Sequence, residues 1–309
     1  MKKTSVSLMV VVAVFFLVCG INSSEAGSGN LRYSITVSKF KNEAGWAGKW
    51  DVGDGFTTIM TDALQNSKEF IVLGDKEMTM EAMEEQDFAA SGRVAGGKKA
   101  PQKGQMTPAQ LLVRGSITHV QESTTGGGGG LSFQGITIGG STDSAEVNIT
   151  MYLVDSETRQ VKASTKVVGK SGRKGLGLGY HGSKLGGLGG DMEGFMNDNV
   201  GKACEDAVTQ GVDFLVAQLE QIPWEGTVSL VSSGKIAINR GAREGVEEGA
   251  RFDVGQVKEI VDEDTGEVLD SDMAKIATLE VTTVKEKIAY CKIVSGGGVQ
   301  KGMTVMPAR

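Results

Sequence analysis

The segment "TTGGGGGLSFQGITIGGST" (Thr124–Thr142) interrupts two stretches that have the alternating pattern of β-strands. "LLVRGSITHV" (Leu111–Val120) precedes it, and "AEVNITMYLV" (Ala145–Val154) follows it. Both stretches alternate apolar and polar residues, as strands with one buried face do. The interrupting segment has no charged side chain and contains five consecutive glycines. The sequence therefore predicts a strand pair joined by a segment that has almost no side chains.

Two strands and two helices are predicted before this pair. The strands are expected at Arg32–Phe40 and Glu69–Gly74. Apolar residues recur at helical spacing in Asp51–Ser67, and Asp51 or Asp54 can cap its first turn. Asp75–Ser91 has acidic residues near its start, which suits the helix dipole. Its three methionines are interpreted as fillers at the edge of a helical core, rather than as a metal or binding face: Met78, Met80 and Met83.

The chain after the strand pair predicts a hairpin and one long helix. "VDSETRQV" (Val154–Val161) places turn-forming residues between two alternating runs. Apolar residues from Asn197 to Ile222 form one stripe at helical spacing. Strands and helices in this order predict a layered α/β or α+β domain, residues 27–222, with helices packed on the strands.

A second domain, residues 223–309, is predicted after Pro223–Gly226, which breaks the long helix. It reads as strands and turns only, and Lys235–Val254 resembles Lys292–Met306 in its order of Lys-Ile, glycine and a final strand. A small all-β barrel or sandwich is expected.

The first 26 residues read as an export signal peptide. Lys2 and Lys3 precede an apolar run, and Ser24–Ala26 provides small residues at the cleavage position. A membrane anchor is the first alternative, but the run is shorter than the ~20 residues that a span needs. A lipoprotein leader at Cys19 is the second, although the bulky Val18 stands where a small residue is needed.

Catalytic signatures are missing from the sequence. His119 and His181 do not lie near a carboxylate or serine motif, and no catalytic, cofactor or metal site is predicted. "GLGLGYHG" (Gly175–Gly182) has the glycine spacing of a dinucleotide site, but no helix can follow it directly. The net charge of −6 argues against a nucleic-acid partner. Cys204 and Cys291 are expected to be buried free thiols.

A second glycine-rich segment, Gly169–Gly194, lies between the predicted hairpin and the long helix. Like residues 124–144, it is long enough for two arms of ~10 residues, the length that crosses a tilted barrel wall in a membrane. The pattern alone favours loops, because a lone glycine-rich hairpin is not stable in water. The alternative is membrane hairpins ordered by neighbouring subunits, whose apolar residues are Leu131, Phe133, Ile136, Ile138, Leu176, Leu178 and Tyr180.

The order of these elements resembles the CsgG/HfaB family, the curli-type secretion components of the bacterial outer membrane. The resemblance extends roughly from Tyr33 to Trp224. It implies a periplasmic domain that assembles into a ring, in which two hairpins from each subunit form one membrane barrel. The two glycine-rich segments stand where the family has those hairpins. Four stretches carry the resemblance: "FTTIMTDALQNSKEFIVLGDKEM" (Phe56–Met78), "LLVRGSITHVQES" (Leu111–Ser123), "NITMYLVDSETRQVKAS" (Asn148–Ser164) and "ACEDAVTQGVDFLVAQL" (Ala203–Leu219).

In that family, a loop between the first strand and the first helix narrows the channel. The corresponding stretch here is Asn42–Gly55, with Trp46 and Trp50 as its protruding groups; the alternative is that both indoles pack under the loop. The chain departs from the family in its predicted leader and in its scarcity of aromatic residues. Its second glycine-rich segment also has positive charges that suit a channel lumen and not lipid: Lys170, Arg173, Lys174 and Lys184.

The sequence thus predicts a ring-forming envelope protein that is not an enzyme. It would serve secretion or assembly of surface material through a passive outer-membrane channel, in the periplasm and outer membrane of a Gram-negative-type bacterium. No cofactor is expected, and the expected partners are further copies of the chain and secreted protein cargo or envelope proteins. The alternative is a soluble periplasmic scaffold or adaptor that binds envelope partners without forming a pore.

Overall fold

The structure is a computed structural model. The predicted signal peptide, with Cys19, lies outside the residues that it describes. The described residues are 31–95, 97, 100–124, 132–133, 136–137, 143–172, 192–232, 234–264 and 268–308.

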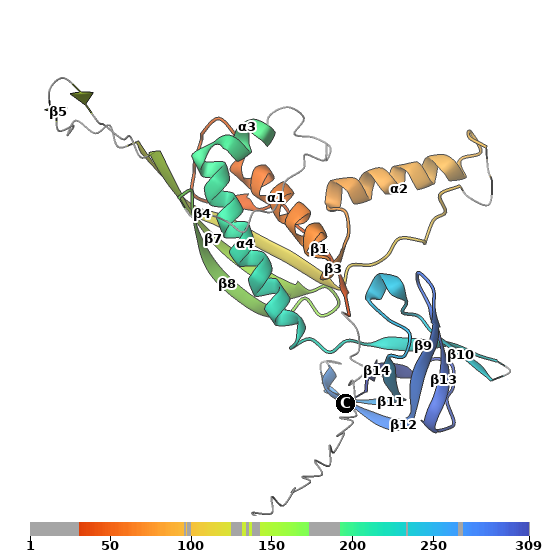
Figure 1. Ribbon diagram of the computed structural model, residues 1–309. Coiled ribbons are helices and arrows are strands. Elements are labelled where there is room, and N and C mark those ends of the chain that lie inside the picture. Colours follow the sequence, from red (N-terminus) through yellow and green to blue (C-terminus); the bar gives the residue numbers. More distant parts are fainter. Residues whose placement is uncertain are drawn as a thin grey trace, which may run out of the picture.

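A mixed sheet forms the centre of the first part of the chain (Figure 1). Its strand order is β3-β1-β4-β7-β8, with the short β2 beside β4. β1 runs parallel to β3 and β4, whereas β4, β7 and β8 are successively antiparallel. The strands that flank the first glycine-rich segment therefore pair as predicted. The strand bounds are β1 (Tyr33–Val37), β2 (Lys41–Asn42), β3 (Phe70–Val72), β4 (Leu111–Thr124), β7 (Asp143–Asp155) and β8 (Val161–Lys170).

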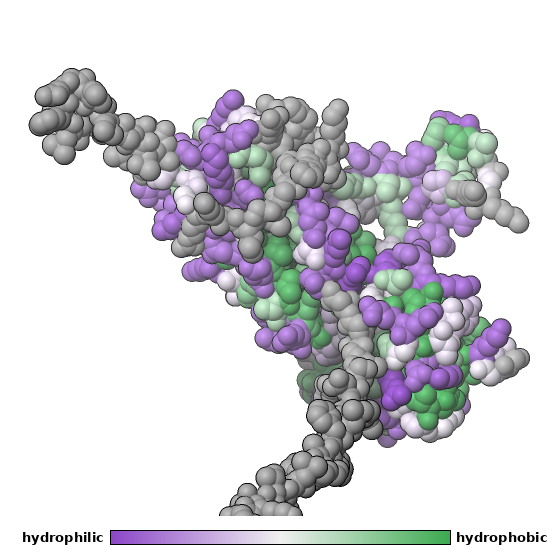
Figure 2. Space-filling view, viewed as in Figure 1, coloured by the Kyte–Doolittle hydropathy of each residue, from purple (hydrophilic) through white to green (hydrophobic). Residues whose placement is uncertain are grey.

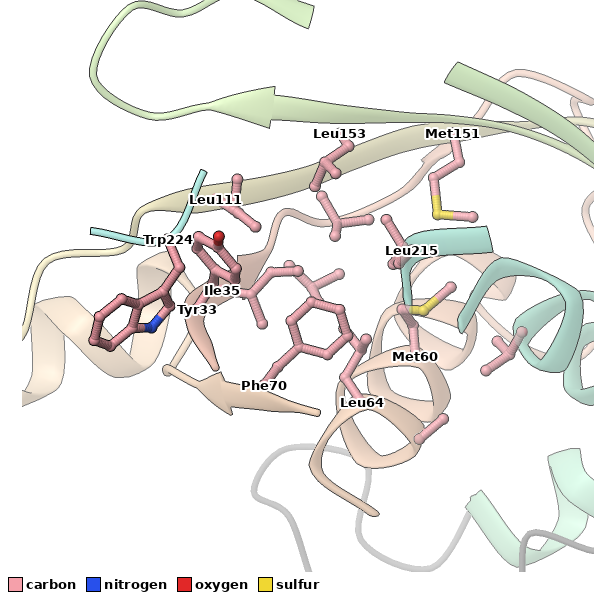
Figure 3. Close-up of a cluster of buried hydrophobic side chains, with 14 of the residues drawn as sticks. Tyr33, Ile35, Met60, Leu64, Phe70, Leu111, Met151, Leu153, Leu215 and Trp224 are labelled. Carbon is pink, nitrogen blue, oxygen red and sulfur yellow. The ribbon is translucent and has the colours of Figure 1, made fainter. Parts of the chain in front are cut away.

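Two helices, α1 (Val52–Ser67) and α4 (Asn199–Leu219), pack against each other and cover one face of this sheet. Figure 3 shows Met151 and Leu153 of β7 in the same apolar cluster as Met60 of α1 and Leu215 of α4. Every second residue of β7 is buried, which explains the alternating pattern of the sequence. Burial of these side chains supplies the main stabilisation of the layer, at about 25 cal/mol per Å² of apolar surface.

The helix starts follow from local capping. The Asp51 carboxylate accepts hydrogen bonds from the backbone N–H groups of Gly53 and Asp54, so Asp51 is the cap of α1. The predicted helix from Asn197 to Ile222 is found as α4, which the Asp198 side chain caps. A short helix, α3 (Met192–Asn197), precedes it.

Helix α2 (Lys76–Ala90) forms where predicted, but none of its residues is buried. It extends away from the helices that cover the sheet (Figure 1). The interpretation of its methionines as fillers at a core edge is wrong, because Met78, Met80 and Met83 are all exposed. The acidic start of the segment predicted the helix correctly, but it did not reveal that the methionines lack a partner in the described part of the chain.

The second part of the chain folds into a closed β-barrel with the order β10-β13-β12-β11-β14-β9. β14 pairs with both β11 and β9, which closes the sheet and selects a barrel over a sandwich. Phe252, Val254 and Leu279 fill its interior. The elements are β9 (Gly226–Ser232), β10 (Lys235–Ile238), the 3₁₀ turn η1 (Ala242–Glu244), β11 (Arg251–Val261), β12 (Val268–Val284), β13 (Ala289–Gly296) and β14 (Thr304–Pro307).

β11 and β12 continue beyond the barrel as a hairpin. Within the described residues, 256–261 and 268–274 pair only with each other, and we call these residues the outer hairpin. Several of its apolar side chains are exposed, among them Ile260 and Leu269. Figure 2 shows hydrophobic residues on the surface of this region.

The layered part and the barrel share one cluster of buried residues. Trp224 stacks on Phe252 with ring centroids 5.2 Å apart. The Tyr33 hydroxyl donates to the carbonyl oxygen of Ile222 at 2.5 Å, and the Arg32 N–H donates to that of Glu244 at 2.9 Å. The division into domains at residue 223 stays a prediction, because packing is continuous across it.

Candidate functional site

Both glycine-rich segments leave the sheet at the same end. Thr124, the last residue of β4, pairs with Asp143, the first residue of β7. Nearby, Glu146 of β7 pairs with Lys170, the last residue of β8. We call this the glycine end of the sheet; the barrel lies toward the other end (Figure 1). The strand order thus brings together two segments that are separated by an entire hairpin in the sequence.

The base of the second segment is held firmly. The Lys170 N–H donates to the Asp206 carboxylate of α4 at 2.9 Å, and the Lys170 ammonium lies 3.1 Å from the Glu146 carboxylate. Ser171 and Ala145 exchange two hydrogen bonds. A Cβ on Gly169 would lie 1.9 Å from the Ala203 carbonyl oxygen, so only glycine permits this approach of β8 to α4. The segment therefore starts from a rigid base.

The tryptophan loop, residues 43–51, lies at the same end. The N–H groups of Glu43 and Ala44 both donate to the Ile117 carbonyl oxygen of β4, which fastens the start of the loop to the sheet. The Asn42 side chain donates to the Trp46 carbonyl oxygen at 2.7 Å. Trp46 itself packs over Gly48, where a Cβ would meet the indole ring.

Trp50 joins this loop to α3. Its indole meets the Phe195 ring edge-on at 6.4 Å, and Gly194 leaves the room that the indole fills. The Lys49 ammonium lies 4.4 Å from the centre of the same indole. Both tryptophans are half-buried and touch the edge of the core. Whether they narrow a channel stays a prediction.

Phe195 is the residue of this region that sequence reasoning missed. It is buried against Gly55 of α1 as well as Trp50, so it holds the loop, α1 and α3 together. In the sequence it belongs to a run of glycines, and no periodicity marks it. A signal existed in the polar residues around it, since "DMEGFMND" contains a single large aromatic residue on a short helix.

Most of the predicted membrane-hairpin residues lie outside the described part of the chain, namely Leu131, Ile138, Leu176, Leu178 and Tyr180. Phe133 and Ile136 pair with each other in a short antiparallel ladder of β5 (Ser132–Phe133) and β6 (Ile136–Thr137). This local pairing is compatible with a hairpin. The insertion of either segment into a membrane remains a prediction.

The described residues offer little for catalysis. No group of three or more His, Cys, Asp or Glu side chains among them is placed to hold a metal ion. Cys204 and Cys291 are both buried and free, as predicted. Burial raises the pKa of the Cys291 thiol to about 12 and raises that of Cys204 as well, for which the Asp198 charge is a second cause. Both thiols are therefore protonated and unreactive near neutral pH.

A cleft of about 860 Å³ lies between the end of α4 and the barrel. Tyr33 and Trp224 contribute its aromatic wall, and Asp272 of the outer hairpin and Lys275 of the barrel also line it. Burial, together with the Glu157 charge, raises the pKa of the Glu225 carboxyl at its edge, while Arg240 opposes that shift. The cleft is a second place where a partner could contact the protein.

In the described part of the chain, no helix has both the length and the hydropathy required to cross a membrane.

A family model described as "Curli production assembly/transport component CsgG" matches residues 21–248. The match covers the whole layered part, including the glycine end, and continues into the barrel through β9, β10 and η1. No curated protein matches the chain.

Three solved structures have a low similarity to the chain. The hypothetical protein CT253 from Chlamydia trachomatis is 11% identical, with 62% of this chain and 100% of that chain covered and a TM-score of 0.36. The PelC dodecamer from Paraburkholderia phytofirmans is 10% identical, with coverages of 58% and 85% and a TM-score of 0.30. Lipoprotein GNA1162 from Neisseria meningitidis is 14% identical, with coverages of 62% and 99% and a TM-score of 0.28. At these TM-scores, the assembly and location of those proteins do not carry over.

Proposed function

The chain belongs to the CsgG family, and from that membership we propose that it is an exported, ring-forming component of the cell envelope. It serves the secretion or assembly of surface material. Each subunit contributes its two glycine-rich segments as hairpins to one shared barrel in the outer membrane. Transport through this channel is passive, since the ring supplies an opening and a constriction and needs no cofactor.

One observation carries the proposal: the bases of both glycine-rich segments and the tryptophan loop lie together at the glycine end. Strands in a membrane need every backbone group paired, which a closed barrel achieves. A ring of subunits with all glycine ends on one side would place the hairpins edge to edge, so that each supplies the pairing of the next. The tryptophan loop would then surround the entrance.

The positive charges of the second segment fit the same arrangement. Lys170 is half-exposed at the base of the segment, although it pairs with Glu146. Arg173, Lys174 and Lys184 follow in the sequence. Charged residues are tolerated on the lumen side of a membrane barrel, whereas each would cost about 2–4 kcal/mol on the lipid side at the midplane. The lumen would therefore be positively charged and would favour anions.

The test is conductance of the purified mature protein in planar bilayers, together with electron microscopy of detergent-solubilised particles. We expect ring-shaped particles and ion-conducting channels. A variant without residues 126–140 or without residues 174–188 should keep the ring and lose conductance. Particles that never enter liposomes, or deletion variants that conduct like the wild type, would contradict the channel.

The tryptophan loop has its own test in the same experiment. Replacing Trp46 and Trp50 by alanine should raise the single-channel conductance, because it widens the proposed constriction. The matched control replaces both by phenylalanine, which keeps an aromatic side chain against Phe195. Equal conductance of all three proteins would remove the loop from the pathway and leave it a packing element.

The second candidate function is a soluble periplasmic scaffold or adaptor. The outer hairpin favours it, because its outer strand edges have no pairing partner among the described residues and its side chains near the tip, such as Ile260 and Leu269, are apolar and exposed. Free edges and apolar side chains are features by which one protein binds another. A protein that stays out of the membrane fraction in every preparation would support this function over the channel.

A further inference from the structure

Helix α2 has no partner in the described part of the chain. None of its 15 residues is buried, and Met80 and Met83 are 51% and 54% exposed. A hollow of about 880 Å³ lies between Met78 of α2 and Leu112 of the sheet, so the helix stands off from its own strands. Figure 2 shows hydrophobic and hydrophilic residues side by side on its surface. A helix of this length is only marginally stable in water without packing.

The charges of α2 add to this instability. Glu77, Glu81 and Glu85 follow one another at four-residue intervals, and Glu84 lies three residues from Glu81. Like charges at these spacings repel each other on a helix surface. Within the described residues, Asp87 is the acidic residue of the helix that has an ion pair, with Lys103 at 2.6 Å. The helix therefore presents methionines together with several unbalanced negative charges.

An apolar surface surrounded by positive charges lies on the sheet face that α1 and α4 do not cover. We call this face the open face. Its residues alternate with the buried ones of β4 and β7. Leu112, Tyr152, Val154 and Val161 line a hollow of about 540 Å³ there. Tyr152 is 38% and Val161 58% exposed. The open face is thus an apolar and aromatic surface that no other described residues cover.

Positively charged side chains surround this apolar surface. Arg114 and Arg159 line the hollow, and Lys166 pairs with Thr150, two residues from Tyr152 along β7. None of these three has an ion pair with another described residue, whereas Asp155, the acidic residue of the hollow, already faces Lys162 at 3.5 Å. The open face is therefore basic where α2 is acidic.

We propose that α2 of one copy docks on the open face of the next copy. Methionines of the helix would cover Tyr152 and Val161, and its glutamates would pair with Arg114, Arg159 and Lys166. A second copy is the occupant because the described part of the chain holds two uncovered surfaces of matching polarity and opposite charge. Such a contact is head-to-tail, and it generates a ring when the rotation closes. This inference rests on the ring of the proposed function and assigns the surfaces that build it.

The test uses two charge-reversal variants of the full mature chain. One carries Glu77→Lys, Glu81→Lys, Glu84→Lys and Glu85→Lys, and the other carries Arg114→Glu, Arg159→Glu and Lys166→Glu. Each alone should sediment as a monomer, because like charges then face each other at every junction. An equimolar mixture should assemble, since every junction between the two variants joins opposite charges again when they alternate around the ring. The matched control, Glu247→Lys with Glu248→Lys on the exposed surface of the barrel side, should assemble like the wild type.

Disulfide trapping gives a second readout that does not need reversed charges. A Met83→Cys chain mixed with a Tyr152→Cys chain should form a crosslinked dimer on oxidation, and neither chain should do so alone. The native Cys204 and Cys291 are buried and do not interfere. A wild-type protein that is a monomer under all conditions overturns the ring itself. A wild-type ring that survives both reversals, or that yields no crosslink, overturns this interface and leaves the ring standing.

Discussion

The layered part and the barrel of this protein differ in how far their strand edges and faces are paired or covered within the described residues. The barrel joins its strands into a closed circle, and ion pairs such as Lys275–Asp253 lie on its surface. Within the described residues, the layered part leaves one sheet face uncovered and one helix without buried residues. The difference teaches how each region treats its strand edges: apart from the outer hairpin, the barrel pairs its strands in a closed circle, whereas the layered part keeps a face and a helix of the kind that partners cover.

The largest expected effect comes from emptying the core that the two regions share. Phe252→Ala removes the ring on which Trp224 stacks and should lower the free energy of unfolding by roughly 3–5 kcal/mol. Denaturant titration followed by tryptophan fluorescence measures it. If the barrel is self-sufficient, Leu215→Ala in the layered part should leave the barrel transition in place. A loss of both transitions together would show that the two regions fold as one unit.

Gly201→Ala should have the next largest effect, and it is confined to the glycine end. A Cβ at this position would lie 1.7 Å from the Phe195 carbonyl oxygen, so the α3–α4 junction must move. Overpacking of this kind costs roughly 1–3 kcal/mol. The control is Gly172→Ala, because a Cβ at Gly172 would meet nothing within 4 Å. Equal thermal stability of the two variants would mean that α3 is loosely held.

Tyr33→Phe probes the joint between the regions. The hydroxyl donates to the Ile222 carbonyl oxygen, and losing this hydrogen bond should cost about 1 kcal/mol. Burial, followed by the Glu225 charge, raises the pKa of Tyr33 above its ordinary value of 10.0. A raised folded pKa means that this stabilisation is complete below about pH 10 and is lost as the pH rises toward the folded pKa. Melting temperatures of the wild type should therefore fall more steeply above pH 10 than those of Tyr33→Phe.

The smallest effect is expected on the barrel surface. Hydrogen bonds from Lys292, and then from Arg251, lower the pKa of the half-buried Glu280 carboxyl. A lowered folded pKa gives stability that is present at neutral pH and is lost as the pH falls through it. Because both cationic partners of Glu280 are exposed, Glu280→Gln should change the melting temperature less than Tyr33→Phe does, and about 1 M salt should abolish the difference. A large effect that resists salt would contradict this.

Local signals predicted much of the fold. The Asp51 cap, the turn between Val154 and Val161 and the alternation of β4 and β7 all depend on residues close in sequence. The barrel was predicted only as a barrel or sandwich, because closure depends on the pairing of β14 with β9, nearly 80 residues apart.

The candidate site was predicted less well, because its contacts join distant residues. Trp50 and Phe195 meet across most of the layered part of the chain, and no sequence pattern links them. The exposed state of α2 was missed for another reason. Helical periodicity reveals a hydrophobic side but does not tell whether the side is covered by the same chain or by another.

Among the described residues, each region contains one buried thiol, and the two thiols can report on local opening of the two regions separately. Cys204 lies on the buried side of α4 and Cys291 lies in β13 of the barrel, and both are buried. A thiol reagent can modify either cysteine only after the structure around it opens. The rate of labelling at each cysteine therefore reports how often that region unfolds locally. The local opening of both regions can therefore be measured in one labelling experiment, without introducing a further cysteine.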